Sequence, residues 1–126
     1  MTMEQSVRVG RVYGPAGAGD GARILVDRLW PRGVSKQAAA LDEWCRAVAP
    51  SNELRGWYGH DPARFGEFTE RYRQELAEPE RSAALDRLRE WHQRGPVILL
   101  TATKAAEISH AAVLAGILRD GQAGPT

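Results

Sequence analysis

The chain has 126 residues, of which 43% are hydrophobic and 26% are charged, with 17 Lys and Arg against 16 Asp and Glu. This length and composition suit one globular domain and exclude a wholly disordered, collagen-like or coiled-coil chain. A net charge of +1 provides no broad basic field for nucleic acid, and no stretch approaches the roughly 18 apolar residues of a membrane span.

The first half of the chain predicts two strands separated by a loop. Partial alternation of apolar side chains predicts a strand over residues 7–13. Residues 14–21 hold four glycines and one proline, which predicts a loop. The apolar run at 22–27, bounded by glycine and followed by a proline, predicts a buried strand. Residues 35–40 are consistent with one helical turn.

Two helix starts follow in the middle of the chain. Ser51 predicts the N-cap of a short helix that reaches Trp57. Asp61 followed by Pro62 is a clear signal for the start of another helix. In that helix, apolar side chains recur at three- and four-residue steps and predict one buried aromatic stripe. The stripe consists of Phe65, Phe68, Tyr72 and Leu76.

The last third of the chain predicts a helix, a strand and a helix. An amphipathic helix with Leu88 and Trp91 on one face ends at the Gly-Pro pair of residues 95–96. Residues 96–102 contain a short apolar run and predict a central strand. The final helix, at about residues 104–119, is apolar on almost all sides and is expected to be buried.

This order of elements predicts an α/β fold. We expect a small single-domain sandwich of two or three layers, with a short, at least partly parallel sheet and four or more helices. The domain is expected to cover residues 7–119, with residues 1–6 and 120–126 as flexible tails. In open α/β sheets, ligands bind beyond the carboxyl ends of the strands.

Polar and cationic side chains follow both apolar strands. They are Arg28 and Arg32 after the first strand, and Thr101, Thr103 and Lys104 after the second. If the strands are parallel neighbours, these side chains share one edge of the sheet with the N-terminus of the last helix. Guanidinium, ammonium and hydroxyl groups bind phosphate or carboxylate. We therefore expect a small-anion site at this edge.

Three further residues are expected to support the site. Asp27 ends the first apolar run, and a buried acid there is expected to orient Arg28 or Arg32. Trp30 could stack on a base or a guanidinium, or close the core instead. Ser109 lies near the start of the final helix. The alternative is that Asp27 only pairs with an arginine and that the hydroxyls only cap the helix.

His110 is the candidate general acid or base, expected one to two turns inside the final helix. The alternative is a hydrogen-bonded core histidine. Neither His60 nor His92 has metal-ligand spacing to His110, and there is a single cysteine, so we expect no metal. The glycine-rich loop at 14–21 fits neither the P-loop nor the dinucleotide-binding template, so we expect no cofactor.

Cys45, the single cysteine, is expected to be a buried structural thiol. It cannot form an internal disulfide, and residues 1–10 lack the apolar stretch of a secretory signal. Both observations favour the cytoplasm as the compartment. We expect no membrane partner, and the sequence leaves the oligomeric state open.

Residues 25–33, Leu-Val-Asp-Arg-Leu-Trp-Pro-Arg-Gly, resemble the signature of the bacterial YeaO-like proteins, a domain-of-unknown-function family. The resemblance covers about residues 7–119 and includes residues 41–44, 49–51, 53–55, the aromatic helix, Leu99-Leu100, Lys104 and residues 110–114. It implies a small cytoplasmic α/β domain and no established reaction.

The chain departs from this resemblance near the last helix. Family members usually have an acid just after the Lys104 position and an asparagine before the histidine, where this chain has Ala105 and Ser109. Longer relatives carry Cys-His-Arg where this chain has Ser109-His110-Ala111. A thiol or acid mechanism is therefore not expected at this position.

These features predict a protein that binds a small phosphorylated or nucleotide-like anion at the strand ends. The same residues would allow metal-free acid/base chemistry, so the sequence leaves open whether the protein is an enzyme. One alternative is a nucleic-acid-binding module that uses Arg28, Arg32 and Trp30. The other is a protein-interaction domain without catalysis, whose aromatic helices present a surface to a partner.

Overall fold

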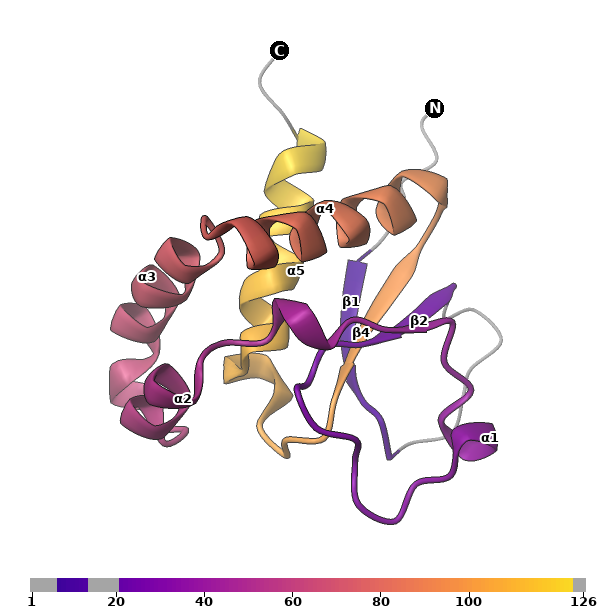
Figure 1. Ribbon diagram of the computed structural model, residues 1–126, viewed down its shortest axis with the longest axis horizontal. Helices are drawn as coiled ribbons and strands as arrows, with labels where there is room; N and C mark the ends of the chain where they lie inside the picture. The colour runs from indigo at the N-terminus through magenta and orange to yellow at the C-terminus, as the bar shows by residue number, and fades with distance from the viewer. Residues whose placement is uncertain (1–6, 14–20, 124–126) are drawn as a thin grey trace.

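The computed structural model describes residues 7–13 and 21–123. Within these residues, four strands form one sheet in the order β1-β4-β2-β3, and every neighbouring pair is parallel. The strands are β1 (Val7–Arg11), β2 (Ala22–Leu25), β3 (Glu43–Trp44) and β4 (Val97–Thr101). The predicted α/β fold is confirmed, with β4 inside the sheet (Figure 1). The predicted loop at 14–21 lies outside the described residues except for Gly21.

Five α-helices accompany the sheet in the described part of the chain. They are α1 (Lys36–Ala39), α2 (Asn52–Tyr58), α3 (Phe65–Glu75), α4 (Pro79–Arg94) and α5 (His110–Ala123). The two predicted N-caps are present: the Ser51 hydroxyl accepts from the Leu54 amide, and the Asp61 carboxylate accepts from the Ala63 amide. Over residues 7–13 and 21–123, none of the helices combines the length and the apolar character needed to cross a membrane.

The final helix begins at His110, and the predicted start near residue 104 is wrong. The preceding residues form a 3-10 segment (Ala106–Ile108), and Ser109 is extended, with φ −95° and ψ 172°. The Ile108 and Ser109 amides donate to carbonyls three residues earlier, which fixes a tighter turn than an α-helix. His110 is therefore the first residue of α5. This helix continues to Ala123, so residues 120–123 are helical.

Apolar side chains pack on both faces of the sheet. Successive residues of a strand point to opposite faces. Leu99 of β4 packs into the larger cluster with α2–α5, and Leu100 packs into a smaller cluster on the other face. The smaller cluster includes Trp30, Val34, Ala39, Leu41 and Trp44. The second layer on that face is thus the segment that carries α1, and α3, α4 and α5 gather on the opposite side (Figure 1).

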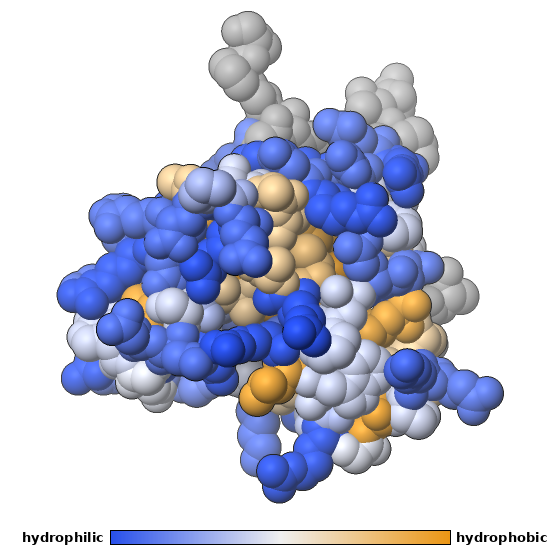
Figure 2. All heavy atoms as spheres, in the orientation of Figure 1, coloured by the Kyte–Doolittle hydropathy of each residue, from blue (hydrophilic) through white to orange (hydrophobic). Residues whose placement is uncertain are grey.

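The aromatic stripe of α3 is part of the core. Phe68 is 1% exposed and Tyr72 is fully buried, and the Tyr72 hydroxyl donates to the Val48 carbonyl. Phe65 is half-buried and packs against this cluster. The surface around α2 and α3 is mostly hydrophilic in Figure 2. Because these aromatic side chains are buried, they are not available as a surface for a protein partner.

Gly21, directly before β2, lies against Pro96, directly before β4, and this position is expected not to tolerate a side chain. Its φ is +74°, and an added Cβ would lie 2.3 Å from the Pro96 carbonyl oxygen, which accepts from the Ala22 amide. Gly21→Ala should therefore lower the free energy of unfolding by about 1–3 kcal/mol, as measured by urea denaturation. Gly66→Ala, in α3 with open space around it, is the control and should be neutral or stabilising. Equal effects of the two substitutions would contradict the close approach at Gly21.

Candidate anion-binding site

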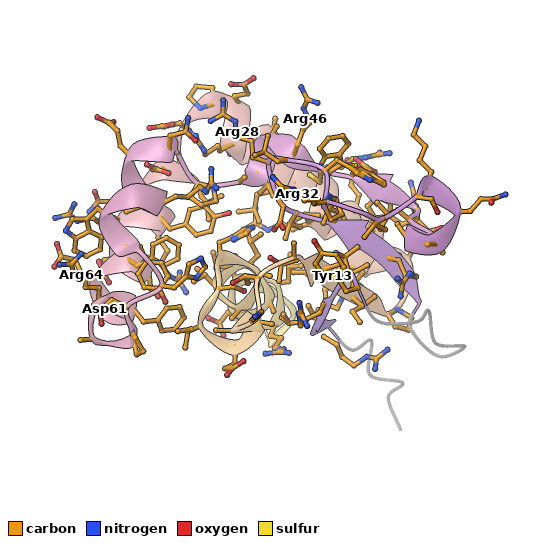
Figure 3. All side chains as sticks on the ribbon, turned by 90° about the horizontal axis from the view of Figure 1, so that it is seen from below. Tyr13, Arg28, Arg32, Arg46, Asp61 and Arg64 are labelled. Carbon is orange, nitrogen blue, oxygen red and sulfur yellow. The ribbon has the colours of Figure 1, made fainter. Side chains whose placement is uncertain are left out.

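A hollow of about 460 Å³ opens at the carboxyl edge of the sheet. We call it the strand-edge hollow. It is lined by residues 27–32 after β2, residues 101–103 at the end of β4, and Ser109 and His110 at the start of α5. The two turns share this edge because β2 and β4 are parallel neighbours. Figure 3 looks onto the edge, with Arg28 and Arg32 on one side and Tyr13 on the other.

Asp27 and His110 form a paired group in the wall of the hollow. His110 Nε2 lies 3.0 Å from the Val26 carbonyl oxygen and 3.2 Å from Asp27 Oδ1. A carbonyl only accepts hydrogen bonds, so Nε2 carries the proton. Asp27 Oδ2 accepts from the Ala102 amide at 2.8 Å. One carboxylate therefore connects the ends of β2 and β4 to the start of α5.

The expected pairing of Asp27 with Arg28 or Arg32 is wrong. The Ala102 amide lies one residue past the end of β4, and the carboxylate supplies its acceptor. This contact and His110 draw Asp27 toward α5. Both arginines are exposed, and neither has an ion-pair partner among residues 7–13 and 21–123.

Asp27 is ionised because its neighbours stabilise the charged form. Burial raises the pKa of Asp27, but the hydrogen bond and charge of His110, the Ala102 amide and the Thr101 hydroxyl together lower it more. The net effect is a pKa below the ordinary 3.8. At neutral pH the carboxylate is therefore fully charged and already hydrogen-bonded, and Arg28 and Arg32 remain unpaired beside it.

The predicted hydroxyl groups are mostly engaged within the protein. Thr101 is 1% exposed, and its hydroxyl interacts with Asp27. The Thr103 amide donates to Thr101 Oγ1 at 3.3 Å. The Ser109 hydroxyl is also buried and donates to the Ala106 carbonyl at 2.6 Å. These residues line the hollow, and their hydrogen bonds fix its wall.

Trp30 lies in the wall of the hollow, and Lys104 does not. The Trp30 indole donates to the Val34 carbonyl at 2.7 Å and packs edge-on against Trp44, with ring centroids 5.2 Å apart. These contacts hold the indole in place. Lys104 is exposed and is not among the residues that line the strand-edge hollow. The structure thus brings together all the predicted site residues except Lys104.

Several lining residues were not predicted as part of the site. They are Tyr13, Leu29, Pro31, Ala49, Pro50, Arg55, Tyr58, His60, Phe68 and Ala102. Arg55 adds a third guanidinium, and Tyr58 stacks on Phe68 at 4.2 Å and donates to the Ile108 carbonyl. Arg55 lies in a segment that carries the family resemblance, which is the signal that could have found it. Among the described residues, no three His, Cys, Asp or Glu side chains gather as a metal site.

Cys45 is buried, and it is expected to be unreactive in the native protein. Burial, together with the nearby charge of Glu43, raises the pKa of its thiol to about 11. Thiolate is the reactive form, so labelling by a disulfide reagent at pH 8 should be roughly a hundredfold slower in the folded protein than in urea. Equal rates in the two conditions would contradict the buried thiol.

Comparison with known proteins places this chain in a family. A family model described as the inactive DUF488-N3 subclade matches residues 6–124. The chain belongs to this DUF488 subclade. The resemblance to YeaO-like proteins is confirmed, since the uncharacterized protein YeaO of Escherichia coli (strain K12) is 43% identical over 114 residues, 90% of this chain and 97% of its own.

A second relative of this DUF488 chain is a mycobacterial protein. The uncharacterized protein Rv3073c of Mycobacterium tuberculosis (strain ATCC 25618 / H37Rv) is 50% identical over 118 residues, 94% of this chain and 98% of its own. The comparison with solved structures found no match.

Proposed function

We propose that this DUF488 protein binds a small phosphorylated anion in the strand-edge hollow. One observation carries the proposal: Arg28 and Arg32 line the same concave site, and neither is ion-paired within the described part of the chain. Guanidinium groups recognise phosphate through charge-assisted, bidentate hydrogen bonds. A bound anion would supply the charged partner that the two guanidinium groups lack.

The surroundings of the two arginines support an anion as the ligand. Asp27 is the one carboxylate among the described residues that line the hollow, and its oxygens face His110 and the Ala102 amide. Arg55 adds positive charge from α2. The volume of about 460 Å³ lies in the range of small-molecule sites, about 300–1,000 Å³. The hollow therefore favours a ligand of nucleotide size.

The proposed role is binding without turnover. His110 Nε2 is already directed at the Val26 carbonyl and at Asp27, which leaves Nδ1 as its second ring nitrogen. With the proton on Nε2, Nδ1 is an acceptor, so it can receive a hydrogen bond from a ligand hydroxyl and does not donate to a phosphate oxygen. The buried Ser109 hydroxyl and the family's description as inactive support the same role.

Calorimetric titration with adenosine 5′-monophosphate and with inorganic phosphate tests the proposal. Arg28→Ala and Arg32→Ala should each weaken binding about tenfold or more, since a hydrogen bond to a charged group contributes about 1.5–3 kcal/mol. Their melting temperatures should stay near wild type because both side chains are exposed. Arg89→Ala, on the surface of α4 and not among the lining residues, is the matched control and should bind as wild type.

Two results would contradict the proposal. The first is the absence of binding by wild type, and the second is an equal affinity of the Arg32→Ala and Arg89→Ala proteins. Tighter binding of a single-stranded oligonucleotide, with a steep dependence on salt, would favour the nucleic-acid alternative instead. Slow hydrolysis of the nucleotide, lost in His110→Ala, would contradict binding without turnover.

A further inference from the structure

A second hollow, of about 510 Å³, lies beside the strand-edge hollow. The two share five lining residues, which form the wall between them: Arg28, Leu29, Trp30, Ala49 and Pro50. The rest of the second hollow comes from Trp44, Arg46 and Ala47, and from Glu80 and Arg81 in α4. The two hollows are therefore immediate neighbours on either side of this shared wall.

The second hollow has its own unpaired cation. Arg46 is exposed, and its guanidinium lies 5.2 Å from the centre of the Trp44 ring. It forms no ion pair within residues 7–13 and 21–123. Arg81 is engaged, because it donates to the Ala49 carbonyl and to the Glu78 carboxylate. Glu80 is the one carboxylate among the described residues that line this hollow, against three arginines.

Arg28 and Trp30 connect the two hollows. Figure 3 shows Arg28, Arg32 and Arg46 on the same side of the molecule. Arg28 lines both hollows, Arg32 lines the strand-edge hollow and Arg46 lines the second. Trp30 lines both hollows, and its contacts with Val34 and Trp44 hold it in place. A fixed aromatic side chain between separate arginines matches a nucleotide, whose base stacks on aromatic rings and whose phosphates bind guanidinium groups.

We infer that the two hollows together bind a nucleotide with two separate phosphate groups, of the nucleoside 3′,5′-bisphosphate class. The inference rests on the proposed function and specifies its ligand. One phosphate lies with Arg32 in the strand-edge hollow and the other with Arg46 in the second hollow. Arg28 lies between them and contributes to both.

Titrations with three thymidine nucleotides test the inference: the 5′-monophosphate, the 5′-diphosphate and the 3′,5′-bisphosphate. The bisphosphate should bind wild type about tenfold more tightly than the monophosphate, which is the gain from one additional charged hydrogen bond. The diphosphate, whose two phosphates are adjacent, should gain less. Arg46→Ala should remove the bisphosphate's advantage and leave monophosphate affinity unchanged, and Arg89→Ala should change neither.

The outcomes separate this inference from the proposed function. If the monophosphate binds through Arg32 but the bisphosphate is no tighter, the inference is overturned and the anion site stands. An advantage that persists in Arg46→Ala, or an equal gain from the diphosphate, also overturns the inference. If none of the three nucleotides binds, the proposed function fails together with it.

Discussion

Phe68→Ala is expected to lower the free energy of unfolding by about 3–5 kcal/mol, the usual cost of emptying a buried aromatic site. Phe68 is 1% exposed, and its ring stacks on Tyr58 at 4.2 Å and lies 5.7 Å from the Tyr72 ring. Removing the ring leaves a cavity between α2 and α3 and takes away a wall of the strand-edge hollow. Urea denaturation followed by circular dichroism measures the loss.

Glu70→Ala is the matched control for Phe68→Ala. Glu70 is exposed on the same helix, and its removal should change stability by less than about 0.5 kcal/mol. Phe68→Leu should lie between the two, because leucine fills part of the cavity. A loss of under about 1 kcal/mol in Phe68→Ala would show that α3 does not pack on the core through this face.

Asp27→Ala is expected to destabilise the protein by about 2–4 kcal/mol, because it removes the charged partner of partly buried polar groups. The substitution leaves the Ala102 amide without an acceptor and His110 without its carboxylate. Asp27→Asn keeps one acceptor oxygen and should lose less. If the stability of Asp27→Ala equalled that of wild type in urea denaturation, the carboxylate would not connect β2, β4 and α5.

The contribution of Asp27 is also expected to depend on pH in a defined direction. The pKa of Asp27 is lower in the folded protein than the ordinary 3.8. Its stabilising effect is therefore fully present above about pH 4 and is lost as the pH falls through the lowered folded-state pKa. The stability difference between wild type and Asp27→Asn should shrink as the pH falls from 5 to 2. A difference that grows over this range would contradict the lowered pKa.

Local sequence patterns predicted two kinds of element: helices that bury one face, and apolar strands bounded by glycine or proline. Phe68 and Tyr72 recur at helical spacing, so α3 could be predicted from α-helical geometry alone. The apolar runs of β2 and β4 also appear in the sequence, because strands of a parallel sheet are buried on both faces. Their order in the sheet follows from packing between distant segments.

The candidate site was predictable in part, since its residues follow two adjacent parallel strands. The partner of Asp27 could not be predicted, because the carboxylate accepts from the backbone amide of Ala102, 75 residues away in the sequence. The late start of α5 depends on the backbone path that brings Ser109 and His110 to the sheet edge. Arg55 and His60 reach the hollow only through the packing of α2 against α3.

The location of anion binding is the central claim, and a two-dimensional ¹H–¹⁵N NMR titration with adenosine 5′-monophosphate tests it most directly. The amide signals of Arg28, Arg32, Ala102 and His110 should shift together and saturate at one dissociation constant. Amides on the exposed side of α4, such as that of Arg89, should not move. Shifts confined to α4, or no saturable shift at the strand-edge hollow, would contradict the account.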